Sequence, residues 1–244
     1  MIPKKIHYCW FGGKPLNALG EKCLASWKKF FPDYEIIEWN ESNFDINCCA
    51  YVQEAYAAKK WAFVSDYARL KILHEYGGVY FDTDVEVIRP MEDIIFAGGF
   101  MACEQDTPSH VAPGLGLAAE PGLELYKELL EEYHSRHFLN EDGSFNLKTI
   151  VEYTTDSLRK HGLTDTDKIQ FVAGISVYPK AYFNPMDMSS GRLVITQNTR
   201  SIHHYAASWE SKKNIFRGKV YRFIYRCFGE GAAEALRHLL GKKS

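Results

Sequence analysis

Residues 61–88 read WAFVSDYARLKILHEYGGVYFDTDVEVI, and this stretch decides the fold. Residues 61–76 have the apolar spacing of a helix, and the Gly77-Gly78 pair is a strong signal for its C-terminus. Aromatic and β-branched residues then dominate 79–88, which predicts a strand. A helix that leads through glycine into a strand is typical of an α/β chain.

The sequence before this stretch extends the same pattern. Residues 4–11 and 34–39 are short β-rich runs, and residues 16–31 between them have helical periodicity. A strand, a helix and a second strand within about 35 residues form a βαβ unit, which indicates a parallel sheet.

The sequence after this stretch continues as alternating elements without a repeat or a linker. The remaining predicted strands are 99–103, 111–119, 169–178 and 193–205, and the predicted helices are 121–136 and 147–161. We therefore predict one compact α/β domain over residues 1–211, with a mixed, mostly parallel sheet flanked by helices.

Charge is segregated between this domain and the end of the chain. The 244 residues carry a net charge of −2, which argues against a globally basic nucleic-acid binder. Residues 212–244 contain nine Lys or Arg and two Glu, a net charge of +7. Apolar residues recur at helical spacing in this tail, which predicts a basic amphipathic helix. It either lies on an anionic membrane surface or packs against a protein surface.

Sequence features at the cellular level favour the cytoplasm. No apolar run reaches the ~18 residues of a membrane span, and MIPKKIHYCW has no apolar segment of a signal peptide. The six cysteines form no C-x-x-C pair, so neither a zinc ribbon nor a thioredoxin-type site is indicated. Scattered cysteines fit a reducing compartment, where they act as small buried groups.

The acidic pair in GGVYFDTDVEV carries the strongest chemical signal. Alternation along a strand places Tyr80, Asp82 and Asp84 on one face. Two carboxylates held close together repel each other unless a cation lies between them, and carboxylates favour hard ions such as Mg²⁺ or Mn²⁺. The alternative is a pair of solvated loop acids. Asp66 and Arg69 interrupt the apolar face of the preceding helix, and burial of such a pair indicates a polar ligand nearby.

These residues resemble a known family, the DXD-containing sugar transferases. SDYARLKILHEYGGVYFDTDVEVIRP (65–90) is similar to the core signature of capsular-polysaccharide and lipopolysaccharide transferases, of fungal Golgi mannosyltransferases and, more distantly, of the glucosylating clostridial toxins. IPKKIHYCWFGG and HHYAASW resemble the first strand and the last motif of the family, so the likeness spans about residues 2–209.

The resemblance implies a GT-A fold, a Rossmann-like sheet that binds a nucleotide sugar at its strand ends. It implies that Trp10 stacks on the nucleotide base, and that Cys9 and Ser65 line the base and ribose pocket. Asp66 and Arg69 would hold the donor sugar and diphosphate, with Tyr80 at the border of the site. Asp82 would contact ribose and a metal-bound water, and Asp84 would ligate the metal, with Mn²⁺ favoured over Mg²⁺.

HHYAASW adds two further predicted groups. His203 and His204 lie on opposite faces of an extended segment, so one of them reaches the metal, and spacing in the toxin relatives favours His204. The alternative is a core or surface histidine. Trp209 resembles the tryptophan whose indole N–H reaches the leaving diphosphate, and its alternative is a core aromatic residue.

The function that this resemblance implies is a metal-dependent, retaining hexosyltransferase in surface polysaccharide synthesis. The donor would be a nucleotide sugar, with UDP favoured over GDP, and the acceptor a saccharide or a lipid-linked saccharide. The enzyme would be cytoplasmic, with the tail on the inner face of the membrane. Two alternatives are a haloacid-dehalogenase-like phosphatase, in which Asp82 would be a nucleophile, and a non-catalytic nucleotide-sugar-binding module.

Overall fold

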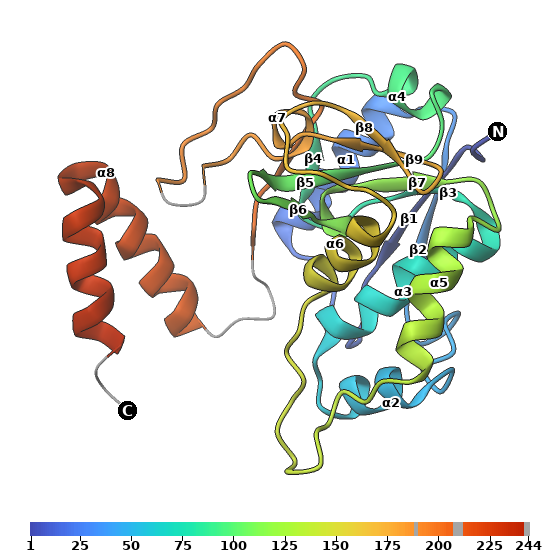
Figure 1. The fold of residues 1–244 in the computed structure, drawn as a ribbon, viewed down its shortest axis with the longest axis horizontal. Coiled ribbons are helices and arrows are strands. Elements are labelled where there is room, and N and C mark those ends of the chain that lie inside the picture. Colours follow the sequence, from blue (N-terminus) through green and yellow to red (C-terminus); the bar gives the residue numbers. More distant parts are fainter. Residues whose placement is uncertain (188–189, 207–211, 242–244) are drawn as a thin grey trace.

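The computed structural model describes residues 1–187, 190–206 and 212–241. Its centre is an eight-stranded sheet in the order β2-β1-β3-β7-β5-β9-β8, with β6 paired to β5 (Figure 1). Strands β2, β1, β3, β5 and β9 run in one direction, and β7, β8 and β6 run in the other. The predicted α/β class, with a mixed, mostly parallel sheet flanked by helices, is confirmed.

The N-terminal βαβ unit forms as predicted. Strand β1 (Lys5–Cys9) and strand β2 (Glu35–Trp39) pair in parallel, and helix α1 (Ala18–Phe30) connects them. The Asn17 side chain caps α1 by accepting a hydrogen bond from the Gly20 N–H. Cys23 and Trp27 bury the apolar face of this helix against the sheet.

Helix α3 has the predicted bounds, Trp61–Tyr76, and leads into the centre of the sheet. It ends at Gly77, after which β3 (Gly78–Tyr80) pairs in parallel with β1. Gly78 has a φ of +105°, and a Cβ there would lie 2.8 Å from the Lys5 carbonyl oxygen. Only glycine therefore lets β3 begin this close to β1.

The prediction of a single strand over 79–88 is wrong. The chain leaves β3 after Tyr80, turns, and enters a separate strand β4 (Val85–Val87). Strand β4 pairs antiparallel with β10 (Ser201–His203) in a second, two-stranded sheet. The two aspartates therefore lie in the turn between two sheets and not on one face of a strand.

The later elements agree with the predictions in kind, and all of them except β5 are shorter or divided. The predicted strand 111–119 is divided into β6 (Ser109–Val111), the 3₁₀ helix η1 (Pro113–Leu115) and β7 (Leu117–Ala119). The predicted strand 169–178 is a hairpin, and only 201–203 of the predicted 193–205 is a strand. The other elements are β5 (Phe100–Asp106), α5 (Glu124–His134), α6 (Ile150–Lys160), β8 (Gln170–Val172) and β9 (Ile175–Tyr178).

Three helices escaped the sequence analysis. They are α2 (Ala50–Ala57), α4 (Glu92–Phe96) and α7 (Lys180–Phe183). Each is eight residues or shorter, so none spans enough turns to show a clear apolar period. Packing on the sheet, more than local sequence, stabilises helices of this length.

The sheet separates two hydrophobic cores. One core contains buried side chains of α2, α3, α5 and α6, and the other contains side chains of α1, α4 and α7. Both faces of the sheet are therefore covered, which explains why β3 and β7 are buried along their whole length.

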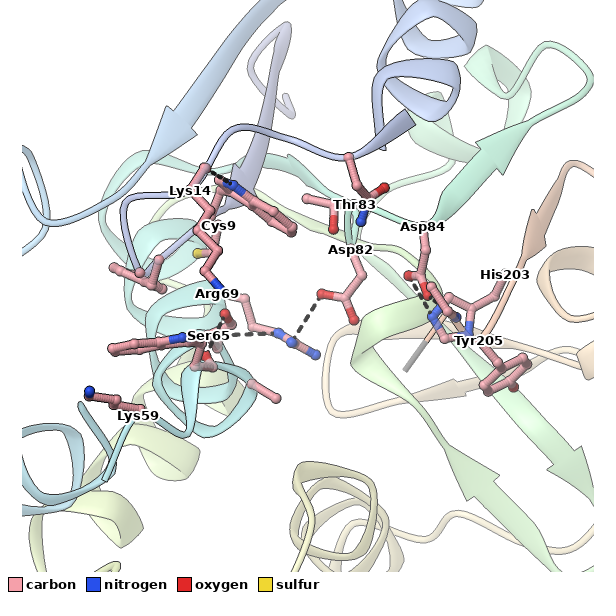
Figure 2. A pocket seen from close by; sticks show the side chains of 17 residues that line it. Cys9, Lys14, Lys59, Ser65, Arg69, Asp82, Thr83, Asp84, His203 and Tyr205 are labelled. Atoms are coloured by element: carbon pink, nitrogen blue, oxygen red, sulfur yellow. Dashed lines mark hydrogen bonds and ion pairs between the residues drawn. The ribbon is translucent and has the colours of Figure 1, made fainter. Parts of the chain in front are cut away.

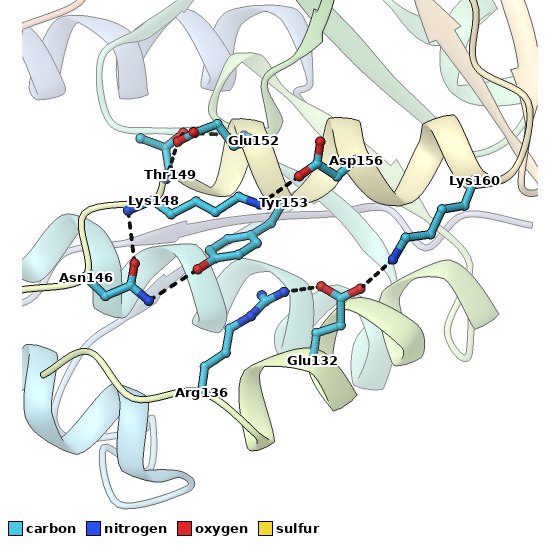
Figure 3. A network of polar contacts seen from close by, with 9 residues as sticks. All are labelled: Glu132, Arg136, Asn146, Lys148, Thr149, Glu152, Tyr153, Asp156 and Lys160. Atoms are coloured by element: carbon cyan, nitrogen blue, oxygen red, sulfur yellow. Dashed lines mark hydrogen bonds and ion pairs between the residues drawn. The ribbon is translucent and has the colours of Figure 1, made fainter. Parts of the chain in front are cut away.

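A polar network joins helices α5 and α6 at the surface (Figure 3). Glu132 accepts hydrogen bonds from Arg136, two residues after the end of α5, and from Lys160 on α6. The Arg136 guanidinium lies 3.5 Å from the ring centroid of Tyr153, a residue of α6. These contacts fix the start of the long connection between the two helices.

The basic tail is helical in the described residues. Helix α8 (Lys212–Gly241) bends at Gly229, where φ is +81°, and Figure 1 shows it as two segments beside the sheet domain. Phe216, Phe223 and Phe228 are exposed. Within the described part of the chain, no helix has the length and apolar composition to span a membrane.

Candidate functional site

A pocket of about 410 Å³ opens beside the turn that carries the two aspartates (Figure 2). Its walls come from the end of β1, the start of α3, the turn after β3 and the segment after β10. This volume lies within the range of small-molecule sites. The position, outside the carboxyl ends of β1 and β3, is where open α/β sheets bind ligands.

Asp82, Thr83 and Asp84 form one wall of the pocket. The Asp82 Oδ1 atom forms an ion pair with Arg69 Nη2 at 3.0 Å and accepts a hydrogen bond from the Tyr80 hydroxyl at 3.1 Å. The other oxygen, Oδ2, faces Gly114 of η1, where an added Cβ would lie only 2.3 Å away. The absence of a side chain at this glycine leaves the space that the Asp82 carboxylate occupies.

Arg69 is the buried cation of the site. Its Nη2 atom lies 3.1 Å from Asp66 Oδ1 and 3.0 Å from Asp82 Oδ1, and its side chain is only 5% exposed. Its Nε–H donates to the Ser65 carbonyl oxygen, and the guanidinium lies 5.1 Å from the Tyr80 ring centroid. One guanidinium therefore links α3 to the turn after β3, and burial makes this link strong.

Burial and this guanidinium set the charges of the two paired acids. Burial raises the pKa of Asp66 to about 7, although Arg69 opposes the rise. Burial also raises the pKa of Asp82, again against the effect of Arg69. The pKa of Arg69 is raised, because its acidic neighbours outweigh its own burial. The site thus holds a permanent positive charge between two acids whose pKa values are raised by burial.

Asp84 is held by two residues of the HHYAASW motif, His203 and Ala206. Its Oδ1 atom lies 3.0 Å from His203 Nε2, and its Oδ2 accepts a hydrogen bond from the Ala206 N–H at 2.8 Å. Burial alone would raise the pKa of Asp84, but the His203 ring and the backbone donor outweigh it and lower the pKa. For His203 burial acts to lower the pKa, and the Asp84 carboxylate reverses that and raises it.

The two histidines lie on opposite sides, but the structure assigns them differently from the sequence analysis. His203 lines the pocket and contacts Asp84, whereas His204 Nε2 contacts Glu86 Oε2 at 2.8 Å. His203, and not the predicted His204, is therefore the histidine that lies beside the acidic pair. The reason is register: His203 is the β10 residue that pairs with Val85, the residue after Asp84.

Most of the other predicted residues also meet at the pocket. Cys9, Trp10 and Ser65 line it together with Arg69, Asp82 and Asp84. Burial raises the pKa of the Cys9 thiol to about 12, so this side chain is a neutral wall. Asp66 and Tyr80 lie behind the wall and contact Arg69. Trp209 lies outside the described residues.

The sequence analysis missed several lining residues. Lys14 and Lys59 bring cationic side chains to the pocket, and Trp61 and Tyr205 bring aromatic ones (Figure 2). Lys14 had a usable signal, because it follows the Gly12-Gly13 turn at the carboxyl end of β1. Lys59 and Trp61 sit at the start of α3, where the sequence offers no such sign.

The donor atoms present fit a divalent cation that takes its remaining ligands from a substrate. Among the residues the structure describes, no three His, Cys, Asp or Glu side chains form a ready-made metal cluster. Asp82 Oδ2 has no hydrogen-bond partner there, and buried His203 Nδ1 has none either. Mg²⁺ and similar ions are commonly held by one or two carboxylates together with substrate phosphates.

Comparison with known proteins agrees with this site. Residues 19–99 match the family model described as "Glycosyltransferase sugar-binding region containing DXD motif". They include α3, Asp66, Arg69 and both aspartates of the turn. The resemblance predicted from the sequence is therefore confirmed over these residues, which match the sugar-binding region of DXD-containing glycosyltransferases. No curated protein matches the chain.

Several solved glycosyltransferases resemble the fold at low sequence identity. The PaToxG glycosyltransferase is 17% identical over 65% of this chain and 69% of its own, with a TM-score of 0.49. A glycosyltransferase involved in the glycosylation of the major capsid of PBCV-1 is 11% identical over 83% of this chain and 94% of its own, with a TM-score of 0.46. The galactosyltransferase LgtC is 12% identical over 88% and 93%, with a TM-score of 0.44.

Proposed function

We propose that this chain is a metal-dependent, retaining hexosyltransferase that takes its sugar from a nucleotide donor. The observation that carries the proposal is the turn Asp82-Thr83-Asp84 at the pocket wall, with buried Arg69 bound to its first carboxylate. A metal at this turn would be held by Asp82 and Asp84, with His203 beside them. When bound, it would neutralise charge on the donor diphosphate.

Different residues of the pocket bind different parts of the donor. Trp10 supplies the stacking face for the base, and Cys9 and Ser65 line the neighbouring wall. Arg69 fixes the position and charge of the acidic turn. Lys14 and Lys59 add positive charge for the diphosphate, which gains negative charge as the sugar bond breaks. We also retain the prediction that the Trp209 indole reaches the leaving diphosphate.

The acceptor attacks from the side of the departing diphosphate in this proposal. The contacts of Asp82 support this proposal, because Arg69 and Tyr80 hold its Oδ1 atom and Gly114 confines its Oδ2 atom. A carboxylate held in this way suits a ligand-binding role more than a nucleophilic one. The same contacts argue against the haloacid-dehalogenase-like alternative, in which Asp82 would attack phosphate. A covalent sugar or phosphate adduct on Asp82, found by mass spectrometry, would overturn this part.

A thermal-shift screen tests the proposal. UDP, GDP, CDP and ADP are each added with and without Mn²⁺ or Mg²⁺ to the wild type, Asp84→Asn and Asp167→Asn. A ligand at 100 times its Kd stabilises by about 2.7 kcal/mol. We expect UDP to stabilise the wild type and the exposed-surface control Asp167→Asn only with metal, and Asp84→Asn not at all. No shift in the wild type with any nucleotide and metal would contradict the donor site.

The acceptor side of the proposal is a saccharide or lipid-linked saccharide in surface polysaccharide synthesis. We propose that the reaction takes place in the cytoplasm, with the tail on the inner face of the membrane. The support is the charge of +7 in residues 212–244 and the exposure of three phenylalanines on α8. Basic amphipathic helices of this kind bind anionic membrane surfaces.

A further inference from the structure

A second pocket, of about 400 Å³, lies between helix α8, the loop before β10 and the residue that follows β10. It is lined by Met186, Gly191, His204, Arg222, Phe223 and Arg226. His204 directly follows His203, which lines the donor pocket. Consecutive Cα atoms are about 3.8 Å apart, so the two pockets share one short piece of backbone.

The arginines of α8 are fitted against the loop before β10. Arg226 donates hydrogen bonds to the carbonyl oxygens of Ser190 and Gly191. A Cβ at Gly191 would lie 2.8 Å from Arg226 Nη2 and 2.9 Å from Arg222 Cδ. The glycine therefore permits both side chains to pack against this loop.

The lining is cationic on one side and apolar on the other. Arg222 and Arg226 line it together with His204, and none of its described lining residues carries a carboxylate. Two acids lie beside the lining residues, and both are paired. Glu86 contacts His204 Nε2 and Lys22, and Asp187, which follows Met186, accepts hydrogen bonds from Ser190. Phe223, which is 63% exposed, and Met186 form the apolar part. A guanidinium pair suits a phosphate group. The fork of Arg222 can donate two parallel hydrogen bonds, and Arg226, whose Nε and Nη2 atoms bind the loop, adds a second positive charge.

We propose that this pocket binds a phosphate or diphosphate group carried by the acceptor, with Arg222 and Arg226 as its ligands. The inference rests on the proposed transferase function and names the acceptor class of that site. An acceptor anchored there would present its sugar across the His203–His204 segment toward the donor. The apolar wall suits a hydrocarbon chain next to the phosphate.

Binding of two probes tests the proposal. Inorganic pyrophosphate and geranyl diphosphate are titrated into the full chain while the His204 imidazole resonances are followed by NMR. The variants are Arg222→Gln and Arg226→Gln, and Arg192→Gln serves as a control because it removes an exposed arginine of the same loop that does not line the pocket. Charged hydrogen bonds are worth about 1.5–3 kcal/mol, so each pocket variant should weaken the affinity by at least about tenfold.

Arg222→Gln and Arg226→Gln are both measured, so that one variant still tests the proposal if the other disturbs the fold. Arg226 also holds the loop, whereas Arg222→Gln leaves those hydrogen bonds in place. Tighter binding of geranyl diphosphate than of pyrophosphate would support a lipid-linked phosphate. Equal affinities would support a soluble phosphorylated saccharide. Wild-type affinity in both pocket variants, or no change at His204 with either probe, would overturn the proposal.

A second measurement separates this inference from the proposed function. The metal-dependent thermal shift with UDP is measured on the same variants. We expect Arg222→Gln to keep the full shift, because Arg222 does not line the donor pocket. Loss of that shift would overturn the assignment of the arginines to an acceptor site. Absence of the shift in the wild type would contradict the donor site and leave the pyrophosphate result to be judged on its own.

Discussion

At the scale of one residue, the lack of a side chain at Gly114 makes room for the Asp82 carboxylate. An added Cβ there would lie 2.3 Å from Asp82 Oδ2 and 3.4 Å from Arg69 Nη1. Because Arg69 and Tyr80 hold Asp82, its carboxylate cannot move aside without losing the ion pair with Arg69 and the hydrogen bond from Tyr80. We expect Gly114→Ala to weaken metal-dependent nucleotide binding at least about tenfold, and to cost about 1–3 kcal/mol of stability from overpacking.

Titration calorimetry with UDP and Mn²⁺, together with urea unfolding, measures both effects of Gly114→Ala. Gly218→Ala is the matched control, because an added Cβ there meets no atom within 4 Å. Unchanged nucleotide affinity in Gly114→Ala would show that Asp82 is not part of the donor site.

His7 is a second residue whose surroundings set a measurable property. Its Nε2 atom lies 3.0 Å from the Gly77 carbonyl oxygen, and the Trp39 indole N–H donates to its Nδ1 at 3.0 Å. The ring is therefore neutral and fully paired, and protonation would place two donors face to face. Burial lowers the pKa of His7 from 6.5 to about 4. The unfolded chain binds this proton first, so stability falls as the pH drops from about 6.5 towards 4.

The expected loss between pH 7 and pH 5 is about 2 kcal/mol from His7 alone. Urea unfolding of the wild type and of His7→Gln at both pH values isolates it, because all other groups titrate in both proteins. The wild type should lose about 2 kcal/mol more than the variant. Equal losses would mean that folding does not lower the pKa of His7.

At the scale of an element, the start of helix α6 is set by two residues close together in the sequence. Thr149 and Glu152 form a capping box, in which each side chain binds the backbone N–H of the other residue (Figure 3). Thr149→Ala should cost about 1 kcal/mol of stability, because it leaves an N–H at the start of the helix unpaired. Thr149→Ser keeps the hydroxyl and should be nearly neutral by urea unfolding. Equal stability of both variants would show that the cap contributes nothing.

Helix α3 and the strand after it show where prediction of elements succeeded and failed. The bounds of α3 were predicted because its sixteen residues span several turns and end at a glycine pair. The strand predicted over 79–88 is divided, because β4 pairs with β10 from more than 110 residues later. Local alternation is the same on both sides of Asp82, so no local pattern marks the point where the chain leaves the first sheet.

At the scale of the whole molecule, the segregated charge predicts an interaction with anionic membranes. Phe216 and Phe228 of α8 are 66% and 71% exposed. We expect the full chain to cosediment with vesicles of phosphatidylglycerol and phosphatidylcholine, and 0.5 M salt to weaken the binding. The double variant Phe216→Asp/Phe228→Asp should bind at least about tenfold more weakly, because it removes apolar burial and adds negative charge.

Phe171→Asp is the control for this experiment, since Phe171 is 77% exposed on β8, outside the tail. It should leave vesicle binding unchanged. Equal binding of the tail variant and the wild type would favour the alternative that the helix packs against a protein surface.

Sequence alone determined the parts of this protein that depend on neighbours in the chain. Periodicity and turn residues identified the βαβ unit, helix α3 and the acidic pair, and the motif between 65 and 90 identified the sugar transferase family. Sequence also singled out Asp66 and Arg69, because a charged pair breaks the apolar face of a helix.

Tertiary structure alone decided which distant residues complete the site. Strand β7 pairs with β3 so that Leu117 lies opposite Tyr80, and this register brings Gly114 over Asp82. Strand β10 pairs with β4, and this register presents His203 to Asp84 in place of His204. The physical reason is that strand order and register depend on the packing of whole sheet faces, which no local pattern of residues encodes.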